Sequence, residues 1–232
     1  LIQLKSEHAE VDNDNTAATQ GEMANAKMDS YGVLYSADGK KLLHYGIDDV
    51  TNDFNFGTIK QQSLKKYSVP EGVTIICDDA FYNCVNLESI VIPEGVKSIE
   101  SYTFNGCSSL QELVLPCSLE RIDTSALTDV RGIESNSPNF IVKDACLYSQ
   151  DLKTLIHFFN NGRTIFNIPN GTTRIESYAF ENAVIRSIFI PNSVSSIGDC
   201  AFAGCEKLQE IELPSSITEI GGAAFDNCAS LY

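Results

Sequence analysis

The stretch IGDCAFAGCEKLQEIELP, residues 197–214, decides the fold of this chain. Its apolar residues Phe202, Leu208, Ile211 and Leu213 follow neither the roughly 3.6-residue period of a helix face nor the alternation of a strand. The same spacing recurs along the sequence, each time at a fixed distance from a proline. The stretch is therefore one unit of an internal repeat, and such repeats indicate a stacked fold.

The repeat unit is 23 residues long between prolines, with one 22-residue unit between Pro169 and Pro191. An aliphatic residue or threonine stands three residues after the proline, isoleucine six, phenylalanine eleven and cysteine fourteen. So short a unit cannot bury its apolar side chains alone, so the units must stack as coils of a solenoid. The phenylalanines are Phe81, Phe104, Phe180, Phe202 and Phe225, and the fourteenth position holds Cys84, Cys107, Ala183, Cys205 and Cys228.

Most units end in a pattern close to Leu-x-x-Ile-x-Leu-Pro, which is typical of the short strand of a leucine-rich repeat. With the phenylalanine and cysteine positions, the consensus resembles the BspA-like (Treponema pallidum-type) leucine-rich repeat proteins over residues 67–122 and 166–232. The resemblance implies an α/β repeat solenoid with short parallel strands. We expect strands near residues 88–92, 111–115, 187–190 and 210–213 in one parallel sheet, with the five phenylalanines buried.

The segments between the repeats are also duplicated. YGVLYSADGKKLLHY (31–45) matches DACLYSQDLKTLIHF (144–158), and each reads as two short apolar strands around a polar turn. We therefore predict two modules within residues 30–232. The first has a hairpin at 31–45, extra residues near 46–66 and repeats at 67–122; the second has a hairpin at 140–158 and repeats at 166–232.

The two ends of the chain differ from the repeats. Residues 1–29 are polar, which predicts a tether or an end segment. The last residue, Tyr232, stands in the middle of a unit, so we expect either that the native protein continues beyond it or that this end is weakly protected.

Composition limits the classes of partner. The chain of 232 residues has 31 acidic and 16 basic side chains, a net charge of -15. This balance argues against nucleic acid and anionic lipid, which select for clustered Lys and Arg. No apolar run approaches the roughly 18 residues of a membrane span, so we expect no membrane insertion.

The eight cysteines suggest either disulfides or buried thiols. A position that accepts both alanine and cysteine is a small apolar site, and stacked cysteines point their side chains the same way, which is poor disulfide geometry. We therefore predict eight free thiols. The sequence has no Cys-x-x-Cys pair for zinc, and DNDN (12–15) lacks the later Gly and Glu of a calcium loop, so we expect no metal and no cofactor.

Catalysis is not expected either. A Cys–His nucleophile pair would need one of three histidines: His8 lies in the polar end segment, and His44 and His157 are matching hairpin positions. A residue duplicated with its module is more often structural than catalytic. We therefore predict that the chain is not an enzyme.

The remaining candidate is the surface. Residues that flank the central aliphatic residue of each strand point away from the core, because side chains alternate along a strand. Some of these outward positions are apolar, which predicts either a binding surface or merely the ordinary preference of strands for such residues. The candidate binding residues are Val91, Val114 and Phe189, surrounded by Glu112, Glu210 and Glu212.

The favoured hypothesis is an exported or cell-surface recognition or adhesion module that binds host or other-cell macromolecules. The resemblance implies an extracellular, bacterial location and a protein ligand, of which host matrix and plasma proteins are examples; a glycan is the other option. The competing hypothesis is a passive spacer that presents another domain of a longer surface protein.

Overall fold

The structure is a computed structural model that describes residues 18–45 and 65–232. Residues 1–17 of the predicted end segment, including His8 and the DNDN run, lie outside the described residues. The same holds for residues 46–64, where the first module was expected to carry extra residues.

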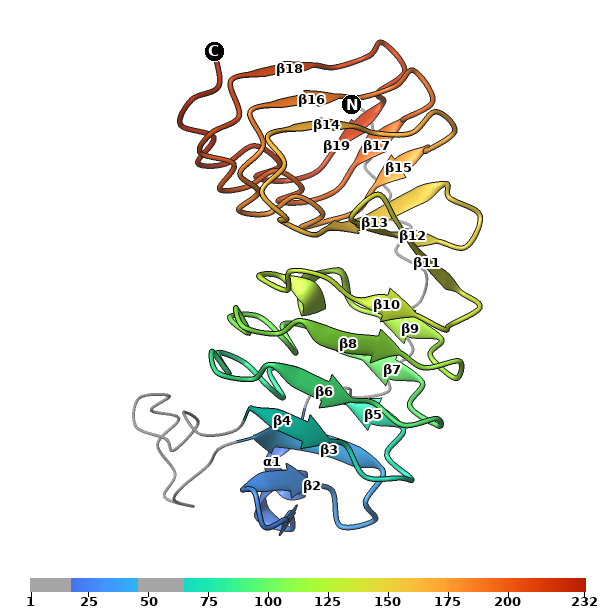
Figure 1. Cartoon of the computed structure of the whole chain (residues 1–232), viewed down its shortest axis with the longest axis vertical. Coiled ribbons are helices and arrows are strands. Elements are labelled where there is room, and N and C mark those ends of the chain that lie inside the picture. Colours follow the sequence, from blue (N-terminus) through green and yellow to red (C-terminus); the bar gives the residue numbers. More distant parts are fainter. Residues whose placement is uncertain (1–17, 46–64) are drawn as a thin grey trace, which may run out of the picture.

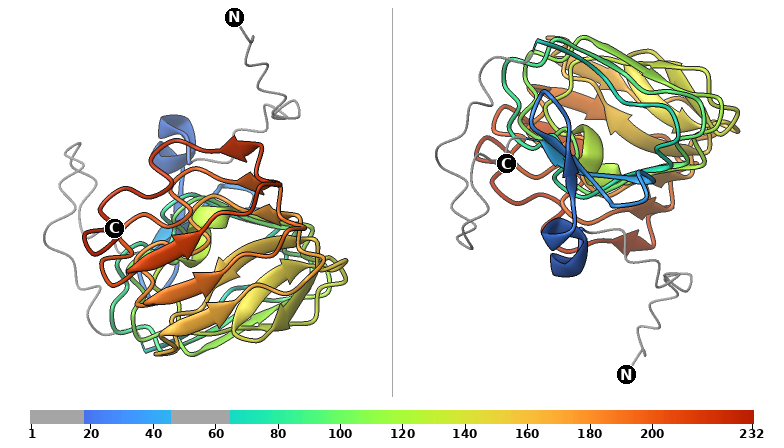
Figure 2. Two further views of the ribbon diagram at one scale, coloured as in Figure 1. Left: turned by 90° about the horizontal axis from the view of Figure 1, so that it is seen from above. Right: turned by 90° about the horizontal axis from the view of Figure 1, so that it is seen from below.

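The described chain winds into coils that stack along one long axis (Figure 1). A full coil has two short strands, which belong to different sheets and lie on different sides of the coil (Figure 2). One is the expected strand before the next proline. The other lies around the isoleucine six residues after the proline; we did not predict it, although that isoleucine recurs in the sequence.

Two sheets form the first part of the solenoid, which we call the N-terminal stack (residues 18–45 and 65–135). One has the order β10-β8-β6-β4 and is wholly parallel. Its strands are β4 (Lys66–Ser68), β6 (Ser89–Val91), β8 (Glu112–Leu115) and β10 (Glu134–Ser135). The other has the order β1-β2-β3-β5-β7-β9. Its strands are β1 (Lys27–Met28), β2 (Val33–Tyr35), β3 (Lys41–Tyr45), β5 (Ile75–Ile76), β7 (Ser98–Ile99) and β9 (Arg121–Ile122).

The C-terminal stack (residues 140–232) repeats this plan. Its parallel sheet has the order β14-β16-β18, formed by β14 (Ile165–Asn167), β16 (Ser187–Phe189) and β18 (Glu210–Glu212). Its other sheet has the order β11-β12-β13-β15-β17-β19. Those strands are β11 (Phe140–Lys143), β12 (Cys146–Ser149), β13 (Thr154–Phe158), β15 (Arg174–Ile175), β17 (Ser196–Ile197) and β19 (Glu219–Ile220).

The expectation of one continuous parallel sheet is wrong. The strands expected at 88–92 and 111–115 belong to β10-β8-β6-β4, and those at 187–190 and 210–213 belong to β14-β16-β18. The physical reason lies between β10 and β14, where the chain forms β11, β12 and β13 in a different sheet. β2 with β3 and β12 with β13 are antiparallel pairs at the start of the two stacks.

The α/β class also needs correction. Among the described residues the helices are α1 (Gln20–Ala24) and the 3-10 helix η2 (Thr124–Leu127). Except after β9, where η2 stands, the segment that follows the strand at the isoleucine is a series of turns. These turns hold residues with positive φ, such as Asp79 and Asn83, which a helix excludes. Their amide groups donate to the next coil instead, as from Phe81 N to Thr103 O at 2.9 Å.

The core is built from stacked rings. Phe81 and Phe104 stack at 5.8 Å in the N-terminal stack, and Phe180 and Phe202 at 5.0 Å in the C-terminal one. These four rings are fully buried, as predicted. Phe225 stacks on Phe202 at 5.3 Å but is only half-buried, because no further described coil covers it.

Some coils approach more closely than a side chain allows. A Cβ added to Gly198 would lie 2.3 Å from Ser177 N of the preceding coil. Gly198 holds the seventh position after its proline, as Gly221 does in the next coil, where other coils have Cys77, Glu100, Asp123 or Glu176. A side chain at either glycine would have to displace the backbone of the preceding coil.

The 22-residue coil keeps its inward residues in phase. Ile185 is fully buried in the place that Leu87 fills in a 23-residue coil. The missing residue is in the turn between the fourteenth position and this aliphatic residue, so the strand β16 that follows still pairs in register with β14.

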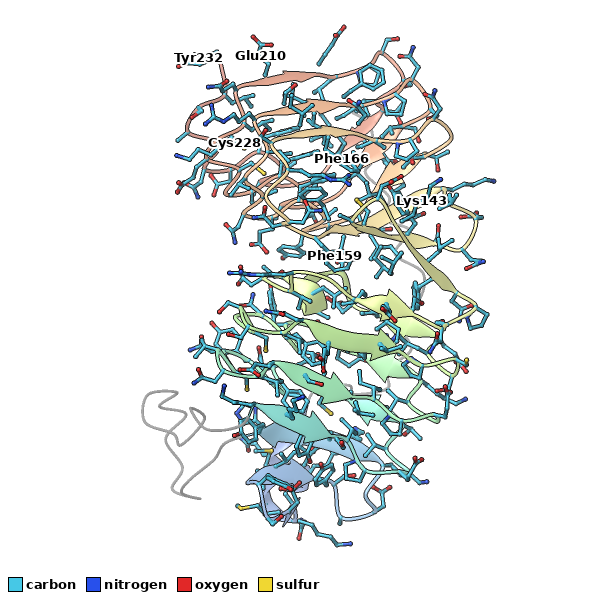
Figure 3. The ribbon with its side chains drawn as sticks, in the orientation of Figure 1. Lys143, Phe159, Phe166, Glu210, Cys228 and Tyr232 are labelled. Atoms are coloured by element: carbon cyan, nitrogen blue, oxygen red, sulfur yellow. The ribbon has the colours of Figure 1, made fainter. Side chains whose placement is uncertain are left out.

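The two stacks meet through polar and aromatic contacts. The Tyr102 hydroxyl lies 3.3 Å from that of Tyr178, and Thr128 Oγ1 donates to Glu181 Oε2 at 3.1 Å. Phe159, labelled in Figure 3, is buried and belongs to the core cluster of the N-terminal stack although it follows β13. The described parts therefore form one stacked body.

Candidate interaction surface

The outer face of the sheet β10-β8-β6-β4 carries part of the predicted surface. Register places Val91 of β6 next to Val114 of β8, and Val114 next to Glu134 of β10. Both valines are exposed, Val91 at 57% and Val114 at 38% of their surface. Glu112 stands two residues before Val114 on the same face. We call Val91, Val114, Glu112 and Glu134 the first patch.

The first patch lies in a shallow groove. A depression of about 440 Å³ runs over β6, β8 and β10 and is lined by Val91, Val114, Glu112 and Glu134. A second depression of about 360 Å³ adjoins it over β4 and is lined by Lys66 and Glu112 among others. The strand face is thus hollowed where its apolar side chains are exposed.

The charges around the groove fall into two groups. The carboxylate of Glu88 is paired with Lys65 at 2.7 Å, and that of Glu94 accepts from the Cys117 and Ser118 amides, which holds its pKa below the usual range. In the part of the chain that the structure describes, no ion pair involves Glu112 or Glu134. Their carboxylates are therefore available to an incoming cation.

The two sheets on the other side of the coils, which contain β9 and β15, carry arginines that are already in ion pairs. Arg121 of β9 is bound to Glu100 at 2.6 Å, and Arg174 of β15 to Glu176 at 2.8 Å. Charges that are already paired attract a partner less than unpaired ones. The face of β4, β6, β8 and β10 is therefore the better candidate.

The remaining predicted residues lie on the other parallel sheet. Phe189 of β16 is 56% exposed, with Glu212 of β18 beside it in register, and Glu210 projects from the outside of β18 (Figure 3). Ile165 of β14 is 66% exposed on the same face. We call Ile165, Phe189, Glu210 and Glu212 the second patch.

The single apolar centre expected from Val91, Val114 and Phe189 is therefore divided between two sheets. Ile165 and Glu134 were missed. Ile165 could have been found by reading the strand pattern backward from Pro169. Glu134 could have been found as well, because Pro138 follows its strand 22 residues after Pro116, the same interval as between Pro169 and Pro191.

The four cysteines at the fourteenth position of the repeat pack inside the coils. All eight cysteines of the chain are free; Cys84, Cys107 and Cys205 are buried, and Cys228 is partly buried. The Cys107 thiol donates to Phe81 O and the Cys205 thiol to Phe180 O, each at 3.1 Å and each across to the preceding coil. Burial raises the pKa of Cys205 to about 12, which disfavours the thiolate that a nucleophile needs.

The two histidines of the described residues, His44 and His157, are held inside the fold. His44 Nδ1 lies 3.1 Å from Asp79 O, and burial lowers its pKa. His157 is buried and stacks edge-on against Phe159, and burial lowers its pKa to about 4. Within residues 18–45 and 65–232, no group of three or more His, Cys, Asp or Glu side chains is placed to hold a metal ion.

The described chain also contains no helix with the length and apolar character needed to cross a bilayer.

Comparison with known proteins agrees with the repeat pattern. The model of the BspA type leucine-rich repeat region matches residues 53–165 and 157–232, with six copies of the repeat. No curated protein matches the chain.

Solved structures share the fold. The pneumococcal vaccine antigen PcpA is 20% identical, with a TM-score of 0.62 over 68% of this chain and 47% of its own. A leucine rich cell surface protein of Faecalibacterium prausnitzii is 26% identical, with a TM-score of 0.57 over 73% of this chain and 59% of its own. A leucine-rich repeat protein of Eubacterium ventriosum is 21% identical, with a TM-score of 0.56 over 89% and 68%. The chain thus spans less than two thirds of the length of the first two proteins.

Proposed function

Since this chain belongs to the BspA-type leucine-rich repeat family, we propose that it is a non-catalytic recognition module that binds a protein partner through the first patch. The observation that carries the proposal is the groove over β6, β8 and β10, which holds an exposed valine pair beside two unpaired carboxylates. Apolar anchors inside a polar rim are the usual arrangement of a protein interface.

The charge of the chain supports a basic partner. With a net charge of -15 and free carboxylates at Glu112 and Glu134, the first patch attracts a surface that offers Lys or Arg. Such attraction increases the association rate and weakens as salt is added. The proposed location is the cell surface, as the name of the 26% identical Faecalibacterium prausnitzii protein states for that protein.

The test is a solid-phase screen of the chain against immobilised fibronectin, fibrinogen, laminin, collagen and glycans. For a protein that binds, the double variant Val91→Ser/Val114→Ser is expected to lose about 1–3 kcal/mol of binding free energy, as truncated anchors do. The matched control is Val85→Ser, because Val85 is 41% exposed outside the patch. Unchanged affinity in the double variant, with the fold preserved, would favour a spacer that presents another domain.

A further inference from the structure

The two patches share equivalent central and third strands, although the first patch extends to β10 and the second to β14. β4, β6 and β8 correspond to β14, β16 and β18, because each triplet stands in the same order before three successive prolines. The central strand has Ser89 and Val91 in one stack and Ser187 and Phe189 in the other. In both, a serine is followed two residues later by an exposed apolar side chain.

The third strand is equivalent at its first outward position, whereas the second holds Val114 in β8 and Glu212 in β18. Register pairs Ser89 with Glu112 in the N-terminal stack and Ser187 with Glu210 in the C-terminal stack. In the part of the chain that is described, neither Glu210 nor Glu212 takes part in an ion pair, as was found for Glu112. Each stack therefore presents an exposed apolar centre with free carboxylates on its later coil.

The patches are nevertheless separate. They lie on sheets that are not hydrogen-bonded to each other, and β11, β12 and β13 come between them in the chain. A bound segment that follows the strands of one sheet therefore does not continue onto the other. Exposed apolar side chains beside free carboxylates therefore occur at two places on one stacked body, whose strands β6 and β16 are labelled in Figure 1.

We propose that the chain has two docking sites of one kind, one on each stack, and that its partner carries two copies of an extended segment in which apolar side chains stand beside Lys or Arg. This inference rests on the proposed function, to which it adds the second site and the character of the partner. The free carboxylates of each patch favour the basic residues, and Val91 with Val114, or Ile165 with Phe189, contact the apolar ones. Two linked segments then bind far more tightly than one, because the second event is intramolecular.

The experiment uses two probes: a short peptide of the repeat Val-Ser-Lys-Ser, whose valine and lysine side chains share one face when the peptide is extended, and a tandem of two such peptides joined by a Gly/Ser linker. Calorimetry of the full chain is expected to give two single peptides per chain. The tandem is expected to bind more tightly than the single peptide by on the order of 10²-fold. A peptide in which glutamate replaces each lysine of this repeat serves as the charge control and is expected not to bind.

Three variants assign the sites. Val91→Ser/Val114→Ser and Ile165→Ser/Phe189→Ser are each expected to bind one single peptide with unchanged affinity. Neither variant is expected to bind the tandem more tightly than the single peptide. The control Val85→Ser/Val184→Ser, which changes exposed valines outside both patches, is expected to behave as the wild type. Circular dichroism of each variant verifies that the fold is retained.

The outcomes separate the two proposals. One peptide per wild-type chain, lost only in the Val91/Val114 variant, would overturn the second site and leave the proposed function standing. Peptide binding that neither patch variant changes would overturn both proposals. Absence of peptide binding, with a matrix protein still captured through Val91 and Val114, would overturn the inferred segment chemistry alone.

Discussion

Tyr35 and Tyr148 hold the same position in the two antiparallel strand pairs, but their hydroxyls have different surroundings. The Tyr35 hydroxyl is hydrogen-bonded to that of Tyr67, which donates to Asp29 Oδ2 at 2.6 Å. In the C-terminal stack the place of Tyr67 is taken by Phe166, and the buried Tyr148 hydroxyl has only the Cys146 thiol, a weak hydrogen-bonding group, as its polar neighbour among the described residues. A buried hydroxyl with so weak a partner costs free energy that a well-paired one does not.

The two tyrosines therefore respond differently to the same substitution. Tyr35→Phe is expected to lower the free energy of unfolding by about 1 kcal/mol, because it removes a hydrogen bond between buried groups. Tyr148→Phe is expected to leave it unchanged or to raise it, because only a weak interaction with a thiol is lost. Urea unfolding of both variants measures the difference. Equal losses would show that the Tyr148 hydroxyl is satisfied in solution.

At the scale of the element, the spacing of adjacent coils decides which residues are tolerated. Gly198 lies against the Ser177 amide, and a methyl group there would have to displace backbone. Gly198→Ala is expected to lower the free energy of unfolding by about 1–3 kcal/mol, as overpacking does. The control is Gly132→Ala, since an added Cβ there meets nothing within 4 Å.

Thermal unfolding of the two glycine variants is the measurement. Gly132→Ala is expected to melt at or slightly above the wild-type temperature, because alanine reduces the freedom of the unfolded chain. If Gly198→Ala melted at the same temperature as Gly132→Ala, the coils would be free to move apart, and the close contact at Gly198 would not limit which residues are tolerated there.

The sequence predicted the inward positions of the coils but not the extent of the sheets. Phe81 and Cys107 could be placed in the core because the repeat marks every position that stacks. The division of Val91 from Phe189 could not be foreseen, because it depends on β11, β12 and β13, which lie outside the repeat. The second strand of each coil was missed for another reason: two residues are too few to show an alternation.

For the whole molecule, the position of a coil along the stack determines how many neighbours support it. The Phe180 ring stacks on Phe158 at 5.1 Å and on Phe202 at 5.0 Å, whereas Phe225 has one ring partner among the described residues. In a repeat protein, stability is close to a sum of such nearest-neighbour terms.

Equal truncations at these two positions should therefore have unequal costs. Phe180→Ala is expected to lower the free energy of unfolding by about 3–5 kcal/mol, as for a fully buried phenylalanine. Phe225→Ala should cost less than half as much, because its ring is half-buried. Urea unfolding of the two variants decides it, and equal costs would mean that the last coil is supported as fully as an internal one.

The 22-residue coil shows what a change of chain length does to this architecture. The residue missing between Ala183 and Ile185 shortens a turn and leaves the next strand in register. A deletion inside a strand would instead turn every following side chain to the other face. Unequal recombination between copies of the repeat in the gene can thus add or remove whole coils, and small length differences survive only in the turns. Relatives of this chain should therefore differ in coil number while keeping the phase of the phenylalanines.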